Sequence, residues 1–478
     1  MSDDLSIRTH DGTVVQVPSD LNAITTYVLL EQERWFEKEP DFLAAWLKPG
    51  MTAIDIGANL GLYSLPMARQ VGPNGRVFAY EPGSDARRRL AASKAANGAA
   101  NLHILSSALS DSVREGRLAF GTSSELNALG DGGNGEAVQI STLDAEDSTG
   151  QWQTVNFVKI DAEGEEERIL DGGAAFFARH SPLIMFEVKA GDASNENLRA
   201  AFAAKGFSIY RLLPGAPVLM PFAPNEQVDH YELNLFAAMP PRAADLAREG
   251  LLVDQVPSWD AAQAPDPLTL IRGQPFGASV LQLAGNASAD PSYLQALAAY
   301  AAWRSFEVAL PRRCAALAFA YEGVLTACEK QPTLARLSTL ARIASEFGMR
   351  GMAGYALKTI SDLLRRGNTK LNEPFWPAHP RFDAIVPGTN MMEWFAVGSL
   401  ERYEQLAVFS SLFGTSGVDL DWLSKQPLAS AEMERRRVLK RALAKAGAVV
   451  GEKLATTAPD HINAAIWAAG HVPGTTVR

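Results

Sequence analysis

The sequence predicts an α/β domain built on a mostly parallel sheet of seven strands, followed by an all-α domain. Three observations indicate this fold class. The chain has 478 residues, more than one hydrophobic core usually supports, so two or three domains are expected. Up to about residue 240, short β-rich runs alternate with helical stretches, which is typical of a sheet with crossover helices. Beyond residue 240, strand patterns become rare and runs rich in Ala, Leu and Arg predominate.

The chain begins with a hairpin pattern and a helical segment. Residues 6–17 alternate around Asp11-Gly12, a dipeptide that favours a hairpin turn. Residues 21–47 are rich in Leu, Trp and Phe and predict helix. This segment either packs against the domain or covers a ligand pocket, and its composition fits both interpretations.

The strands of the α/β domain are dense in Ile, Val, Phe and Leu, as strands buried on both faces must be. They are expected at residues 51–57, 76–81, 102–108, 155–161, 183–188, 207–212 and 233–238. The helices between them are expected at residues 60–70, 84–97, 165–179 and 195–205.

A run of Met239-Pro240-Pro241 predicts the domain boundary, because proline neither donates to a strand ladder nor continues a helix. The two domains are therefore expected at residues 1–240 and 241–478. The second should be a bundle or a repeat-like array of helices. Its main helices are expected at residues 293–310, 312–328, 333–347, 351–366, 390–411 and 429–447. The basic run at 434–445 is interpreted as a solvated helix face.

Composition and charge exclude several classes of protein. A net charge of −10 makes nucleic acid a poor partner, because its phosphates would be repelled. The only two cysteines, Cys314 and Cys328, rule out a disulfide framework and are expected to be buried small residues. The acidic first residues do not resemble a secretion signal, and no apolar run is long enough to span a membrane. A cytoplasmic protein is therefore expected.

The most specific local signal is a hydrophobic strand that runs into a turn containing Gly57, Asn59 and Gly61. Glycine tolerates positive φ angles and leaves the backbone open to a ligand. A dinucleotide fingerprint would require glycine where Asn59 and Ser64 stand, which disfavours NAD. Asp55, at the end of the strand, is instead suited to the ammonium group of S-adenosylmethionine (SAM).

The next two strands end in residues that suit the rest of an adenosyl cofactor. Glu81 ends the second strand, where a carboxylate can accept both hydroxyls of a ribose. After the third strand, Ser107 and Ala108 are small enough to border an adenine ring, although they could equally do no more than end the strand. Together with Asp55 and the glycine turn, Glu81 predicts an adenosyl cofactor.

Three acids are expected to meet at the same edge of the sheet. Asp161 and Glu163 follow the fourth strand and Glu187 ends the fifth, and the carboxyl ends of parallel strands line the ligand crevice. Such a group could position and deprotonate a hydroxyl, or bind a divalent cation that does so, and the metal requirement stays open. An alternative interpretation of Glu163 is that it only caps or pairs within its own turn.

With these motifs, residues 20–240 resemble the FkbM family of SAM-dependent methyltransferases. The resemblance is carried by DIGANLG at 55–61, ALSD at 108–111, TLD at 142–144, KIDAEGE at 159–165 and PLIMFE at 182–187. The KIDAEGE segment is the most family-specific of these. The resemblance implies a Rossmann-like class I methyltransferase fold with a sheet of seven strands. It also implies an enzyme that methylates hydroxyl groups of sugars or of macrolide-type products.

The resemblance also implies residue roles. It makes Asp55, Gly57, Asn59, Gly61 and Glu81 cofactor-binding. Asp161, Glu163 and Glu187 would lie on the acceptor side. Lys189 departs from the family pattern and leaves the identity of the base open.

The function expected from the sequence is transfer of the SAM methyl group to a sugar hydroxyl, as in a surface-polysaccharide precursor, with S-adenosylhomocysteine (SAH) as product. Two alternatives remain. One is an NAD-dependent oxidoreductase, and the other is a non-enzymatic interaction protein with a degenerate methyltransferase domain. The resemblance does not reach the helical half, which could bind a glycan, a carrier or another subunit and could mediate oligomerisation.

Overall fold

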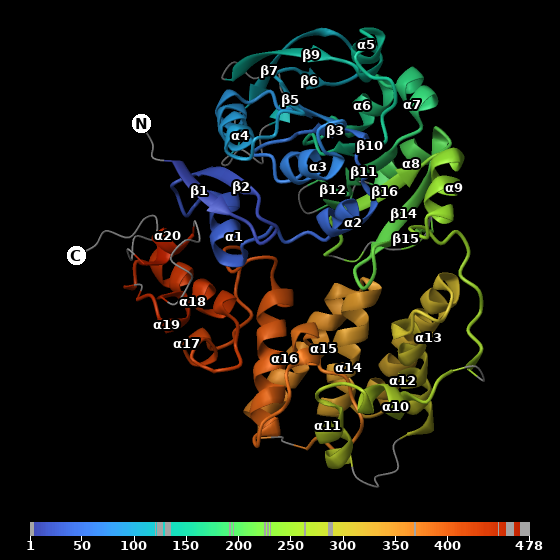
Figure 1. Cartoon of the computed structure of the whole chain (residues 1–478), viewed down its shortest axis with the longest axis vertical. Helices are drawn as coiled ribbons and strands as arrows, with labels where there is room; N and C mark the ends of the chain where they lie inside the picture. Colours follow the sequence, from blue (N-terminus) through green and yellow to red (C-terminus); the bar gives the residue numbers. More distant parts are fainter. Residues whose placement is uncertain are drawn as a thin grey trace.

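The computed structural model describes residues 4–119, 121, 128–129, 135–190, 193–194, 196–223, 226, 229, 231–261, 264–284, 290–367, 370–447, 449–455 and 463–468. Figure 1 shows an α/β half, formed by the first part of the chain, above a half made of helices. The last helices return to lie beside α1 of the α/β half. The predicted combination of an α/β fold with a helical C-terminal region is confirmed.

The central sheet has eight strands in the order β15-β14-β16-β11-β10-β3-β4-β5. Strands β5, β4, β3, β10 and β11 are parallel, and β16 runs antiparallel to both β11 and β14. Their bounds are β3 (Thr52–Ile56), β4 (Arg76–Tyr80), β5 (Leu102–Leu105), β10 (Phe157–Ile160), β11 (Leu183–Glu187), β14 (Ser208–Leu213), β15 (Val218–Pro221) and β16 (Asn234–Ala238). All seven predicted strands are present. The eighth, β15, was missed because prolines flank and end it.

A second, four-stranded sheet lies beside the first and was not predicted. Its order is β6 (Ala108–Leu109), β9 (Glu136–Ser141), β7 (Arg114–Ala119) and β8 (Ala128–Leu129). The predicted strand at 102–108 was therefore wrong in extent, because Ser106 and Ser107 divide it into β5 and β6. Two further short hairpins are β1 (Asp4–Arg8) with β2 (Val14–Pro18), which was predicted, and β12 (Lys189–Ala190) with β13 (Ala193–Ser194).

The helices of the α/β half are shorter than the sequence pattern suggests. They are α1 (Ile24–Gln32), α2 (Glu39–Trp46), α3 (Ser64–Val71), α4 (Ser84–Ala96), α5 (Leu143–Ser148), α6 (Glu166–Asp171), α7 (Ala174–His180), α8 (Glu196–Ala204) and α9 (Pro240–Arg248). The single helix predicted at 165–179 is broken at Gly172, where an added Cβ would lie 2.2 Å from the carbonyl oxygen of Ser110. The helix predicted at 21–47 is interrupted after Glu33, whose φ is +54°.

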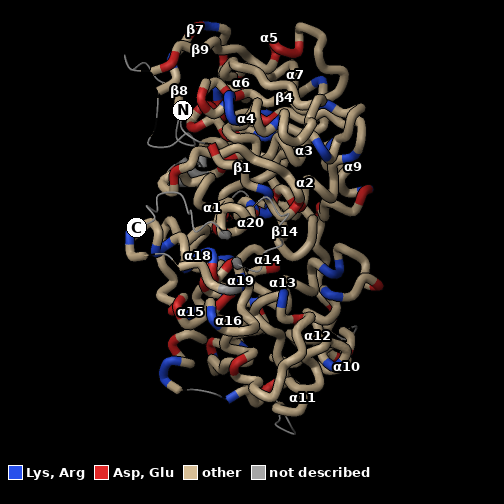
Figure 2. Tube along the Cα trace, turned by 60° about the vertical axis from the view of Figure 1, so that its left-hand side comes forward, with Lys and Arg blue, Asp and Glu red and all other residues tan. Residues whose placement is uncertain are grey.

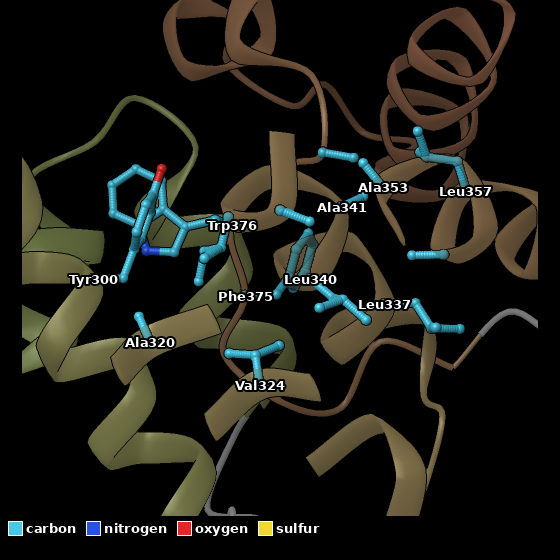
Figure 3. Close-up of a cluster of buried hydrophobic side chains, with 14 of the residues drawn as sticks. Tyr300, Ala320, Val324, Leu337, Leu340, Ala341, Ala353, Leu357, Phe375 and Trp376 are labelled. Atoms are coloured by element: carbon cyan, nitrogen blue, oxygen red, sulfur yellow. The ribbon is translucent and has the colours of Figure 1, made fainter. Parts of the chain in front are cut away.

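The helical half confirms all six predicted helices. Its elements are α10 (Pro267–Arg272), α11 (Gly277–Ala284), α12 (Pro291–Arg304), α13 (Leu310–Lys330), α14 (Leu334–Phe347), α15 (Arg350–Arg365), the 3-10 turn η3 (Pro380–Ala384), α16 (Met391–Ala407), α17 (Leu420–Leu423), α18 (Ala431–Leu443), α19 (Glu452–Ala455) and α20 (Ala464–Ala468). Figure 3 shows Phe375 and Trp376, which precede η3, among side chains such as Leu340 and Tyr300. Cys314 and Cys328 are buried and free, as expected.

Segments beyond residue 240 complete the core of the α/β half. Leu246 of α9 and Val438 and Leu439 of α18 belong to the same hydrophobic cluster as Tyr27 of α1. The chain therefore crosses between the two halves more than once. Within the described residues, no helix is both long and apolar enough to span a bilayer.

The interpretation of the basic run at 434–445 as a solvated face is wrong for its first residues. Arg435 and Arg436 of α18 are buried, and Figure 2 shows acidic and basic residues side by side around this helix. Arg436 is 1% exposed and lies 3.6 Å from both Glu31 and Glu404 and 2.9 Å from Glu432. The sequence pattern could not reveal this, because two of these partners come from distant elements.

Candidate active site

A cavity of about 440 Å³ opens at the carboxyl ends of β3, β4, β10 and β11. The predicted residues that line it are Asp55, Gly57, Asn59, Glu81, Ala108, Asp161, Glu163 and Glu187. Gly61 and Ser107 do not line this cavity. The cavity therefore brings most of the predicted cofactor and acceptor residues together, from five separate segments of the chain.

The glycine turn after β3 is shaped by close backbone contacts. Gly57 has a φ of +77°, and a Cβ at this position would lie 1.8 Å from the carbonyl oxygen of Asp161. Gly61 has a φ of +89°, and a Cβ there would lie 2.4 Å from the side chain of Leu90 on α4. Gly57 thus lets β10 approach the turn, whereas Gly61 allows the turn to pack on α4.

Replacing Gly57 with alanine should therefore disrupt the site more than other glycine substitutions. The added methyl group would collide with the backbone at Asp161, so we expect SAH to bind at least about tenfold more weakly by calorimetry. Gly98→Ala is the matched control, because Gly98 also has a positive φ of +60° but an added Cβ would meet nothing within 4 Å. Equal SAH affinities of the two variants would contradict the role of Gly57.

A buried lysine connects the cofactor and acceptor sides of the cavity. The Nζ atom of Lys159 lies 2.7 Å from Oδ2 of Asp161 and 3.8 Å from Oδ1 of Asp55. Burial opposes its charge, but Asp161 and Asp55 together raise the pKa of Lys159 above its ordinary value. The sequence predicted no role for Lys159 beyond its place in the KIDAEGE segment.

Glu81 is held by two backbone groups. Its Oε2 accepts the N–H of Asn59 at 2.7 Å, and its Oε1 accepts the N–H of Gly83 at 2.7 Å. Burial raises the pKa of Glu81 to about 7, although these two hydrogen bonds act in the opposite direction. The carboxylate therefore has a fixed orientation at the end of β4.

The raised pKa of Glu81 predicts a pH-dependent contribution to stability. In the folded protein the carboxyl group of Glu81 stays protonated up to about pH 7, whereas its ordinary pKa of 4.5 applies in the unfolded chain. The favourable contribution is complete below pH 4.5 and is lost as the pH rises through 7. The stability of the wild type relative to Glu81→Gln should therefore decrease between pH 5 and pH 8, measured by urea unfolding. The exposed Glu322→Gln should show no such change, and a constant difference for Glu81→Gln would contradict the assignment.

The three predicted acids do come together. Carboxylate oxygens of Asp161, Glu163 and Glu187 all lie within 4.8 Å of one another. Burial, and then the nearby Asp161 and Glu163, raise the pKa of Glu187 to about 9. The carboxylate of Glu166 accepts hydrogen bonds from the backbone N–H groups of Ala162 and Gly164, each at 3.1 Å. The two N–H groups of this turn are therefore already hydrogen-bonded. Oxygen ligands at these separations suit a hard divalent cation.

The structure adds residues that the sequence did not single out. Glu37, between α1 and α2, accepts a hydrogen bond from the hydroxyl of Tyr63, and Lys159 lies 5.2 Å from the centre of the Tyr63 ring. Burial raises the pKa of both Glu37 and Tyr63. The segment at 21–47 therefore does contribute to the cavity, as one of its two interpretations held.

Aromatic side chains from both halves of the protein also line the cavity. They are Trp35 and Phe36, which follow α1, and Phe409 and Phe413, which follow α16. No motif around residues 409–413 indicated a ligand site. Their position depends on the way the helical half docks on α1.

The cavity fits an adenosyl-sulfonium ligand. Oδ1 of Asp55 and Oδ1 of Asn59 are buried and have no hydrogen-bond partner among the described residues. Both residues line the cavity. Buried acceptors without a hydrogen bond are costly, and the ammonium and hydroxyl groups of SAM would supply donors. The side chain of Lys189 lies outside the described residues.

Part of the chain is similar to known proteins. Residues 55–209 match the family model of the methyltransferase FkbM domain. Similar solved structures include a methyltransferase FkbM from Methylobacillus flagellatus (15% identity, TM-score 0.27), for which the alignment covers 41% of this chain and 50% of that one. They also include a SAM-dependent methyltransferase from Aquifex aeolicus (14% identity, TM-score 0.26, 46% and 95% coverage). Likenesses at this level carry no information on the acceptor. No curated protein matches the chain.

Proposed function

We propose that this protein methylates a hydroxyl group of a sugar, in a surface polysaccharide or a related glycan, and that residues 55–209, which match the methyltransferase FkbM domain, carry out the SAM-dependent transfer. The observation that carries the proposal is the arrangement of the cavity. Oδ1 of Asp55 and Oδ1 of Asn59, which accept no hydrogen bond within the described residues, line the same cavity as the converging carboxylates of Asp161, Glu163 and Glu187.

SAM, when bound, supplies an electrophilic methyl group. Asp55 and Asn59 would accept hydrogen bonds from its polar groups, and Glu81 would orient the ribose. For an in-line displacement, the main tasks of the protein are to align the reactants and to exclude water.

The acids can remove the proton of the acceptor hydroxyl. Lys159 binds Oδ2 of Asp161, which leaves Oδ1 to accept a hydrogen bond from the hydroxyl and then to take its proton. The pKa of about 9 means that Glu187 holds a proton at neutral pH, so it can donate a hydrogen bond to an acceptor oxygen. Alternatively, a divalent cation held by the same three carboxylates would displace the proton of Glu187 and would polarise the hydroxyl. Loss of turnover in EDTA, restored by Mg²⁺ or Mn²⁺, would support that alternative.

Two measurements test the proposal. Titration with SAH and with NADH distinguishes a methyltransferase from a nicotinamide-dependent oxidoreductase, and we expect SAH alone to bind. A mass-spectrometric screen of glycans incubated with SAM should then find a product with one added methyl group. Failure of SAH to bind would refute the function, whereas methylation of a nitrogen or carbon atom alone would refute the O-methyl assignment. A cytoplasmic location fits the two free, buried cysteines.

A further inference from the structure

Four aromatic side chains form one connected surface along the cavity, which we call the aromatic wall: Trp35, Phe36, Phe409 and Phe413. The Trp35 and Phe36 rings are stacked with centroids 4.4 Å apart. Phe36 in turn lies 4.9 Å from Phe409 and 6.4 Å from Phe413, with the latter pair edge to face. Phe36 therefore joins the two halves of the protein through ring contacts.

The aromatic wall and the acids belong to the same cavity. Besides the wall, its lining includes Glu37, Asp161, Glu163 and Glu187. Carboxylates accept hydrogen bonds from hydroxyl groups, and a protonated carboxyl group can donate one, whereas aromatic faces pack against C–H groups. A ligand that has hydroxyl groups at its rim and an apolar C–H face would satisfy both kinds of side chain, and a pyranose ring has this character.

The loop that carries Phe409 and Phe413 is held against α1 by buried polar contacts. Glu31, which is fully buried, accepts hydrogen bonds from both the backbone N–H and the hydroxyl of Ser411. The hydroxyls of Tyr27 and Ser411 lie 3.0 Å apart, and Gln32 donates to the carbonyl oxygen of Phe409 at 2.7 Å. The loop is thus tied to the α/β half at Phe409 and at Ser411, between the two phenylalanines.

A cation fixes the ring of Phe409 as well. The guanidinium of Arg350 lies 4.2 Å from the centre of this ring and donates to the carbonyl oxygen of Leu406 at 3.1 Å. Such contacts limit the freedom of a half-buried ring. The helical half therefore presents Phe409 to the cavity in a defined position.

We propose that the helical half completes the acceptor site: Phe409 and Phe413, together with Trp35 and Phe36, hold the C–H face of a pyranose ring while the carboxylates bind its hydroxyl groups. This inference rests on the proposed sugar hydroxyl as acceptor. It assigns the helical half a direct part in acceptor recognition, in a segment that lies outside residues 55–209.

Saturation-transfer difference NMR tests the proposal without knowledge of the natural acceptor. The full-length protein, saturated with SAH, is mixed with methyl glycosides of glucose, galactose, mannose and rhamnose, and with 1-hexanol as an aliphatic alcohol. We expect at least one glycoside to receive saturation, strongest at the protons of one C–H face. Phe413 is 50% exposed, so the Phe413→Ala variant should fold normally. Its affinity for that glycoside should be about three- to tenfold lower than that of the wild type.

The control variant is Phe306→Ala, which removes an 89% exposed phenylalanine of the same half that is not part of the cavity. It should bind the glycoside and SAH as the wild type does, and Phe413→Ala should retain SAH affinity. Unchanged glycoside binding in Phe413→Ala would overturn the proposal. Saturation of 1-hexanol but of no glycoside would also overturn it, while SAH binding in the same sample leaves the methyltransferase assignment intact.

Discussion

Replacing Asp161 with asparagine is expected to lower kcat by about a hundredfold or more, because general-base assistance typically contributes at least that factor. Asparagine keeps the size of the side chain but cannot take the proton of the hydroxyl. The affinity for SAH should change by less than about threefold, or well under 1 kcal/mol, because Asp55, Asn59 and Glu81 remain. Steady-state kinetics with an acceptor found in the glycan screen and calorimetry with SAH measure the two effects.

The matched control for this prediction is Asp171→Asn. Asp171 pairs at 2.8 Å with Lys205, and its side chain is 66% exposed, so its loss should leave both kcat and SAH affinity unchanged. Turnover retained in Asp161→Asn would remove Asp161 from the mechanism. A parallel loss of SAH affinity would instead mean that its ion pair with Lys159 organises the cofactor side of the cavity.

Replacing Arg436 with methionine is expected to destabilise the protein by about 3–5 kcal/mol, the usual cost of breaking a buried ion pair. Burial opposes the charge of Arg436, but Glu31, Glu432 and Glu404 together raise its pKa. Glu31 and Glu404 are 0% and 1% exposed. Without the guanidinium of Arg436, these buried carboxylates would lose the cation that lies beside both of them. Equilibrium unfolding in urea measures the change.

Two further variants define this effect. Lys358→Met removes an exposed ion pair with Asp362 and should leave the free energy of unfolding essentially unchanged. Arg436→Lys keeps the charge but has one donor group where the guanidinium has several, so an intermediate loss is expected. Because Glu31 also binds Ser411, Arg436→Met should weaken glycoside binding too. If Arg436→Met were as stable as the wild type, the ion pairs around Glu31 would make no net contribution to the free energy of unfolding.

Local sequence determined most of the α/β fold. Runs of Ile, Val, Phe and Leu marked the seven strands, because strands buried on both faces need apolar side chains throughout. The small sheet built on β7 and β9 was missed, since β7 is largely polar and β9 mixes polar and apolar residues, unlike strands buried on both faces. Breaks at Gly172 and Glu33 were also missed, because the packing that requires them involves residues distant in the chain.

The same division applies to the site. Sequence by itself identified Asp55, the glycine turn and the acids Asp161, Glu163 and Glu187, because motif spacing and the ends of parallel strands place such residues at one edge of a sheet. Only the tertiary structure brought Glu37, Phe409 and the ion pairs of Lys159 and Arg436 into view. Their roles depend on burial and on partners from distant segments, and neither property is encoded in the spacing of neighbouring residues.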